Sequence, residues 1–142
     1  MDPVREKMNQ ALGTLVVPKL RKLGFAGQFP HFRRVRNDRA ELIVFQFNSA
    51  GGSFVVELAT LTAEEVAAHW KADLSLDTAT AYDSDHRRRL GSVDHGDHWF
   101  VFGRRNYELG HDRVESDSHY GRVAQDVARL LDAELSSLRH GA

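Results

Sequence analysis

The most chemically capable stretch of the chain is HRRRLGSVDHGDHWF, residues 86–100. It contains three consecutive arginines, three histidines, two aspartates and a tryptophan. Guanidinium groups bind carboxylates and phosphates through paired hydrogen bonds, whereas imidazole and carboxylate groups bind zinc, nickel or iron. The stretch therefore raises two interpretations, an anion-binding site and a metal site.

The metal interpretation depends on four residues around a glycine: Asp94, His95, Asp97 and His98. Gly96 permits a turn that could bring two of these ligands together. However, the spacing supplies no third ligand, the chain has no His-Glu-x-x-His pair, and it has no cysteine that could act as a thiolate ligand. Asp, His and Gly are also frequent in tight turns. We therefore predict no metal at His95 and His98, and no cofactor.

The arginine interpretation begins with spacing. Arg87 and Arg89 are two positions apart, so in an extended segment their side chains project to one side, while Leu90 projects to the other and anchors in the core. Glu57, the carboxylate expected inside an apolar strand, and Gln46 are the polar groups that could lie beside them. Two roles stay open: a structural ion pair with Glu57, or a clamp for a carboxylate or phosphate beside Gln46 and Glu57.

Other kinds of site have less support. The chain has no G-x-S-x-G motif for a nucleophilic serine, and Ala50–Ser53 reads as a hairpin turn rather than a phosphate loop. A nucleic-acid surface would use four arginines and two phenylalanines: Arg33, Arg34, Arg36, Arg39, Phe29 and Phe32. The net charge of -1 argues against it. Trp70 and Trp99 are expected in the core rather than in a ligand cage.

Charge is unevenly distributed along the chain. Residues 1–39 carry a net charge of +6 and residues 40–85 a net charge of -7. Such blocks neutralise one another within the fold or at a self-association surface, so a homodimer stays open. No apolar run follows a basic start, so we expect no signal peptide, and no run of 18 apolar residues is present. We expect a cytoplasmic protein without membrane contact.

The elements that must position these residues follow from periodicity and turn signals. An N-terminal helix should begin at Asp2-Pro3, be interrupted at Pro18 and end at Gly24. A capping box at Thr62 predicts a helix to about Leu74 that buries Val66 and Trp70. Strands are expected at 29–37, 41–48, 53–61 and 98–105, and a long amphipathic helix at 117–139. Residues 75–85 and 106–116 are expected to be loop and linker.

Alternation within the second and third strands predicts one strongly apolar face. This face should carry Ile43, Phe45, Phe47, Phe54, Val56 and Leu58, and the opposite, mixed face should carry Gln46 and Glu57. We predict an α+β fold over residues 1–142 as a single domain. An antiparallel meander of about four strands would be packed on one face by the N- and C-terminal helices.

The order of several short motifs resembles the bacterial family called domain of unknown function 4304. The motifs are Pro18-Lys19-Leu20, Leu23-Gly24-Phe25, Phe45-Gln46, Gly51-Gly52, Phe54–Leu58, Arg87–Gly91 and Trp99. The resemblance covers roughly residues 4–105 and implies an intracellular α+β domain, but it supplies no reaction. It marks Gln46, Arg87, Arg89 and Trp99. The family pattern differs at Glu57, where an asparagine is usual, and by the absence of a cysteine before the arginine run.

Taken together, these observations favour a binding or interaction module without catalytic activity that uses the open face of the sheet. The candidate binding residues are Gln46, Glu57, Arg87, Arg89 and Trp99. The partner would be a protein or a small anionic ligand. The alternative is an enzyme of unknown reaction on the same face, with Glu57 as acid or base and an arginine as anion clamp.

Overall fold

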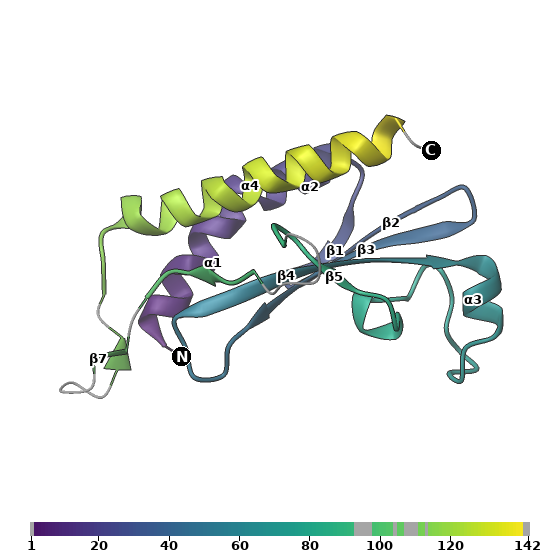
Figure 1. Cartoon of the computed structure of the whole chain (residues 1–142), viewed down its shortest axis with the longest axis horizontal. Coiled ribbons are helices and arrows are strands. Elements are labelled where there is room, and N and C mark those ends of the chain that lie inside the picture. Colours follow the sequence, from purple (N-terminus) through teal and green to yellow (C-terminus); the bar gives the residue numbers. More distant parts are fainter. Residues whose placement is uncertain (1, 93–97, 104, 107–110, 113, 141–142) are drawn as a thin grey trace.

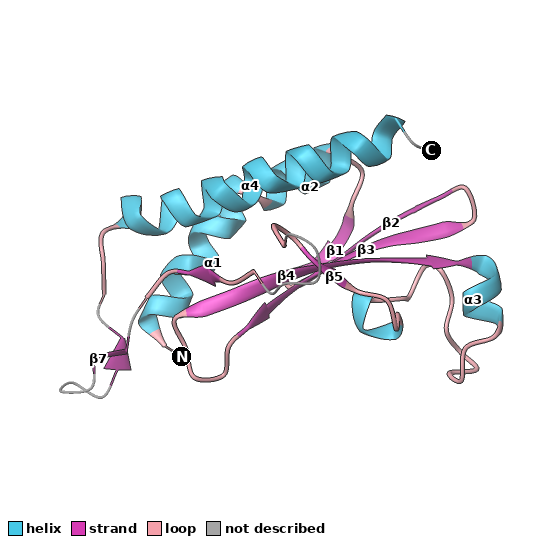
Figure 2. Cartoon of the chain, in the orientation of Figure 1, coloured by secondary structure: helices cyan, strands magenta, loops and turns pink. Residues whose placement is uncertain are grey.

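The computed structural model of the chain describes residues 2–92, 98–103, 105–106, 111–112 and 114–140. Figures 1 and 2 show how the helices and strands of the chain are arranged. The elements, in order, are α1 (Pro3–Leu15), α2 (Val17–Lys22), β1 (Ala26–Gln28), β2 (His31–Arg36), β3 (Arg39–Phe47), β4 (Ser53–Thr62), α3 (Ala63–Ala67), the 3₁₀ turn η1 (Ala81–Asp83), β5 (Arg88–Arg89), β6 (Phe100–Val101), β7 (Arg105–Asn106), β8 (His111–Asp112) and α4 (Asp117–His140).

The N-terminal helix begins and breaks where the sequence predicts. Asp2 Oδ1 accepts a hydrogen bond from the backbone N–H of Val4 at 2.9 Å, which caps α1. Pro18 lies in the first turn of α2, where its missing N–H is tolerated, so the helix restarts there instead of continuing. Gly24 has a φ of +95°, the left-handed conformation that ends many helices.

The sheet is antiparallel, in the order β1-β2-β3-β4-β5, and β6 also pairs with β4. The long β3–β4 hairpin forms its centre, with Phe45 opposite Val56. The expected meander is confirmed, but β1 and β5 were missed. β1 falls between the expected helix end at Gly24 and the strand expected at 29–37, where no element was predicted. β5 contains only two residues, too few for a period-2 pattern to be visible.

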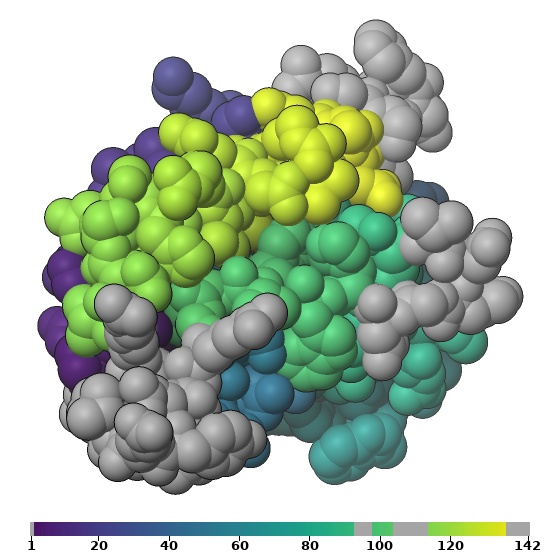
Figure 3. Space-filling model, turned by 60° about the vertical axis from the view of Figure 1, so that its left-hand side comes forward, coloured from purple at the N-terminus to yellow at the C-terminus, as the bar shows by residue number. Residues whose placement is uncertain are grey.

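The face of the sheet toward the long helices, here called the helix face, carries the main core. The predicted apolar face is confirmed, since Ile43, Phe45, Phe54, Val56 and Leu58 are all buried in this core, and Phe47 is half-buried against it. α1 and α4 lie over it side by side in Figures 1 and 2, and α4 forms a continuous ridge above the segment around residue 100 in Figure 3. The terminal helices therefore cover the sheet as predicted.

The opposite face, here called the second face, is less open than expected. Ala40, Leu42, Val44 and Leu61 on this face are buried together with Ala79 and Ala81 from the segment that includes η1. The expected helix from Thr62 to Leu74 was too long. Its capping box is present, but α3 ends at Ala67. Trp70 was expected in the core and is instead 83% exposed.

The region after β5 also differs from the expectation. One strand was predicted over 98–105, whereas β6 and β7 are separate two-residue strands. β7 pairs with β8, which lies in the segment expected to be a linker. The long C-terminal helix is confirmed as α4. Among the described residues, no helix is both long enough and apolar enough to cross a bilayer.

Candidate functional site

A row of register partners crosses four strands on the second face. His31 on β2 lies opposite Val44 on β3, Val44 lies opposite Glu57 on β4, and Glu57 lies opposite Arg89 on β5. Partners directly opposite in an antiparallel sheet project to the same side. The sheet therefore gathers an imidazole, a carboxylate and a guanidinium from widely separated parts of the sequence.

Glu57 sits between the two predicted arginines. Arg87 Nε lies 2.8 Å from Glu57 Oε2, and Arg89 Nε lies 3.6 Å from Glu57 Oε1. The Glu57 side chain is 8% exposed, while those of Arg87 and Arg89 are 36% and 26% exposed. Two guanidinium groups thus meet one buried carboxylate, and this group of three side chains carries a net charge of +1.

The geometry of the arginine run follows its spacing. Arg88 points the other way from its neighbours and forms an ion pair with Glu134 of α4, at 2.9 Å between Nη2 and Oε2. Leu90 is fully buried in the helix-face core. The prediction that Arg87 and Arg89 share one side is therefore confirmed. Gly91, with a φ of +85°, turns the chain immediately afterwards.

Two exposed aromatic rings flank the arginines. The Arg87 guanidinium lies 5.4 Å from the centre of the Tyr82 ring, and that of Arg89 lies 5.1 Å from the centre of a Trp99 ring. Tyr82 is 47% exposed and Trp99 is 41% exposed. The expectation that Trp99 belongs to the core was wrong, because Phe100 takes the inward position of β6. Glu57, Tyr82, Arg87, Arg89 and Trp99 are called the second-face patch below.

His31 extends the patch across the sheet. Its ring centre lies 5.4 Å from that of Tyr82, in an edge-to-face arrangement. His31 Nδ1 and Glu57 Oε2 are both buried and have no aligned hydrogen-bond partner among the described residues. Burial raises the pKa of the Tyr82 phenol, and the charge of Glu57 raises it further, while Arg87 acts in the opposite direction. Tyr82 therefore remains a neutral hydrogen-bonding group.

Gln46 lies on the same face but outside this cluster of contacts. It is exposed and faces Val55, two residues along β3 from Val44. The structure thus brings four predicted residues together, Glu57, Arg87, Arg89 and Trp99, and places Gln46 on the same sheet face nearby.

Sequence reasoning missed Tyr82 and a second buried carboxylate. Tyr82 lies in a segment without periodicity, so no pattern marked it. Glu57 was thought to be the one carboxylate inside an apolar strand, but Glu41 is equally buried, at 6% residue exposure for each. Glu41 binds Arg34 and Arg36, two arginines that the nucleic-acid interpretation had used. The sequence did offer a signal for Glu41, namely a charged residue at a position where strand alternation places the side chain toward the core.

The turn that was examined for metal binding lies largely outside the described residues, since it includes Asp94, His95 and Asp97. Within the described part of the chain, no group of three or more histidine, aspartate or glutamate side chains is placed to hold a metal ion.

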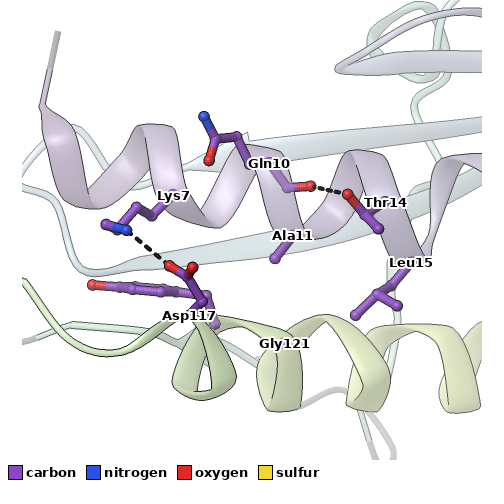
Figure 4. A pocket seen from close by; sticks show the side chains of 8 residues that line it. Lys7, Gln10, Ala11, Thr14, Leu15, Asp117 and Gly121 are labelled. Carbon is purple, nitrogen blue, oxygen red and sulfur yellow. Dashed lines mark hydrogen bonds and ion pairs between the residues drawn. The ribbon is translucent and has the colours of Figure 1, made fainter.

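Of two further hollows, one lies away from the second-face patch and the other shares Arg87 with it. One, of about 280 Å³, separates α1 from α4 where the small residues Ala11 and Gly121 face each other (Figure 4). An ion pair of 2.8 Å between Lys7 and Asp117 closes one end. The other, of about 770 Å³, lies along β4 and is lined by residues that include Leu58, Thr60 and Arg88.

The fold and the patch together define an α+β domain whose antiparallel sheet is covered on one face by terminal helices. The chain belongs to the family described as Domain of unknown function (DUF4304), whose model matches residues 16–139. The match begins later and extends further, through α4, than the motif resemblance indicated. Comparisons with curated proteins and with solved structures give no match.

Proposed function

We propose that this domain is a binding module that holds an anionic group of a protein or small ligand on its second-face patch. The observation that carries the proposal is the pair of guanidinium groups on one buried carboxylate, each lying against an exposed aromatic ring. The motif resemblance supports a bacterial, cytoplasmic setting for this activity.

Charge and geometry support an anionic ligand. Glu57 neutralises one of the two guanidinium charges, so a ligand carboxylate or phosphate would complete the balance at the exposed edges of Arg87 and Arg89. Arginine and large aromatic residues also contribute a disproportionate share of binding energy at protein interfaces. Tyr82 and Trp99 can supply apolar contact around the charge.

A catalytic role has less support. An enzyme using Glu57 as acid or base would need a carboxylate able to exchange protons with a substrate. Here the carboxylate is buried and contacts two permanently charged groups, which favours a positioning role for Glu57. We therefore assign it to the alignment of Arg87 and Arg89.

Native mass spectrometry of the protein purified from its source cells tests the proposal. We expect a bound anionic molecule or protein that is retained by the wild type and by Arg129→Lys, a control on an exposed part of α4. Arg87→Lys and Arg89→Lys keep the positive charge, but lysine cannot form the paired hydrogen bonds by which a guanidinium group holds a ligand carboxylate or phosphate. They should lose the ligand while keeping wild-type thermal stability within a few degrees. Retention of every ligand by both variants would overturn the proposal.

A further inference from the structure

The edge of β4 is only partly covered on the side of β5. β4 continues to Thr62, whereas β5 pairs only with Glu57 and Leu58. Figure 1 shows β4 running past β5 to α3. Residues 59–62 therefore have no strand neighbour on this side among the described residues. A strand edge of this kind presents backbone groups that can pair with another chain.

The hydrogen-bonding phase of the sheet identifies which residue presents these groups. Asn48 N–H donates to Ser53 O at 2.9 Å, so odd-numbered residues of β4 bond to β3. Leu90 N–H donates to Val56 O at 2.8 Å, so even-numbered residues bond toward β5. Beyond Leu58, the even-numbered residues of β4 are Thr60 and Thr62. The Thr62 N–H already donates to the Glu65 side chain, which leaves Thr60. Thr60 N–H and C=O consequently point outward at the uncovered edge.

A hollow of about 770 Å³ lies beside this edge, which is within the usual range for ligand sites. Thr60 and Leu58 form its wall along β4. Arg87, Arg88 and Asp85 line the hollow where β5 begins, and Glu65 of α3 lines it near the end of β4. Residues of β3 also line it, so it extends from the edge over the helix face. The hollow, here called the edge notch, therefore has a net positive charge on the β5 side and a carboxylate on the α3 side.

We propose that the edge notch binds the free C-terminal end of another protein chain, in extended conformation and antiparallel to β4. Such a segment would lie in line with β5 and run in the same direction, so its carboxyl end would arrive at the start of β5. Arg87 projects to the second face there and Arg88 to the helix face. The terminal carboxylate lies beside the guanidinium group of Arg88, on the face where Leu58 and Thr60 also line the notch, while the backbone pairs with Thr60.

The length of the edge notch argues for a chain end rather than a second copy of this domain. The free edge spans residues 59–62 and is closed by β5 at one end and α3 at the other. If two copies paired through this edge, the β5 strand of one copy would occupy the position of the β4 strand of the other. A free chain end avoids this clash, and a basic residue upstream of it would lie near Glu65.

Arg87 lines both the edge notch and the second-face patch. The inferred contacts nevertheless go beyond the patch, because they use the backbone of Thr60 and the side chain of Arg88 and do not need Arg89 or Trp99. The two proposals can therefore fail separately.

Nuclear magnetic resonance of the ¹⁵N-labelled full chain tests the inference. The probe is a pool of random-sequence N-acetyl tetrapeptides with a free C-terminal carboxylate, compared with the same pool amidated at the C-terminus. We expect the free acids to shift the Thr60 amide and the Arg88 Nε–H signals, and the amides to bind about tenfold more weakly or worse.

Variants separate the backbone contribution from the side chains. Thr60→Pro removes the outward N–H at an edge position that tolerates proline. It should abolish the shift of the Arg88 Nε–H signal, whereas the matched control Thr60→Ala should show that shift as the wild type does. Arg88→Gln, at a side chain that is 57% exposed, provides a second test that does not alter the backbone. Equal binding of acids and amides, or no shift at Thr60, would overturn the inference. Loss of binding in Arg89→Lys with retention in Thr60→Pro would transfer the peptide to the second-face patch and also overturn it.

Discussion

Arg34 and Glu41 face each other across β2 and β3, and the guanidinium donates to both carboxylate oxygens. Arg34 Nε lies 3.0 Å from Oε1, and Nη2 lies 2.8 Å from Oε2. Arg34 also donates to Leu23 O at 2.6 Å and lies over the Phe25 ring. The pair therefore ties the segment after α2 to the sheet. Arg36 adds a further hydrogen bond to Glu41, at 2.6 Å.

The first prediction concerns acid stability. Burial raises the pKa of Glu41, but the hydrogen bonds from Arg34 and Arg36 outweigh it and hold this pKa below the ordinary value of 4.5. The contribution of Glu41 to stability is therefore complete above the unfolded-state pKa and is lost as pH falls through the lower folded-state pKa. Chemical denaturation between neutral and acidic pH should show this loss in the wild type.

Glu41→Gln should be about 3 kcal/mol less stable at neutral pH, because it leaves two guanidinium groups without their counter-charge. The difference from wild type should narrow on acidification. Glu64→Gln, the same change at an exposed position, should cost less than ~0.5 kcal/mol at all pH values. A constant difference between wild type and Glu41→Gln across this pH range would contradict the assignment.

The second prediction tests the helix-face core. Phe45 is 2% exposed and packs against Phe29, Phe32 and Phe54. Phe45→Ala should cost ~3–5 kcal/mol in urea denaturation. The adjacent exposed residue provides the control, since Gln46→Ala should change stability by less than ~0.5 kcal/mol. Similar losses for the two variants would mean that strand alternation had been misassigned.

The third prediction concerns electrostatics in the second-face patch. Burial and then the charge of Glu57 raise the pKa of the Tyr82 phenol. Glu57→Gln removes that charge and leaves the positive Arg87 in place, so the Tyr82 pKa should fall toward its ordinary value of 10.0. Carbon-13 resonances of labelled tyrosine, followed during alkaline titration, measure the change. Glu64→Gln should leave the Tyr82 titration unmoved, and an unchanged pKa in Glu57→Gln would refute the proposed coupling.

The fourth prediction compares two glycines. A Cβ at Gly121 would approach Leu15 Cδ1 at 4.0 Å, an ordinary contact, so Gly121→Ala should stabilise α4 by ~0.5–1 kcal/mol. Gly91 has a φ of +85°, and a Cβ there would meet His98 Cδ2 at 2.8 Å. Gly91→Ala should therefore lower the melting temperature, whereas Gly121→Ala should raise it. A lower melting temperature for Gly121→Ala would contradict the first prediction, and an unchanged or higher one for Gly91→Ala would contradict the second.

The parts of the fold that could be predicted are those with long periodic patterns. α4 and the β3–β4 hairpin each have several residues that repeat one signal. The break at Pro18 was predictable for a different reason, because proline cannot continue a helix. β5 and β6 contain two residues each, and their pairing depends on tertiary contacts with β4. The length of α3 was overestimated because its capping box marks where a helix begins and carries no information about where it ends.

The candidate site was predictable in part for the same reason. Spacing alone placed Arg87 and Arg89 on one side, and an inward strand position marked Glu57. Tyr82 joins them only because η1 lies against the second face, and no local pattern encodes that packing. Trp99 was assigned to the core from its residue type, whereas the strand phase set by Phe100 turned it outward.

The position of α4 also has a consequence for synthesis on the ribosome. Tyr120, Val127 and Leu131 of α4 are fully or almost fully buried against a sheet that ends its central hairpin at Thr62. The hairpin can form early because its contacts are local. Its helix face nevertheless stays partly uncovered until the α4 residues leave the exit tunnel. We therefore expect the nascent chain to expose a row of phenylalanines during this interval, the kind of apolar surface that chaperones bind.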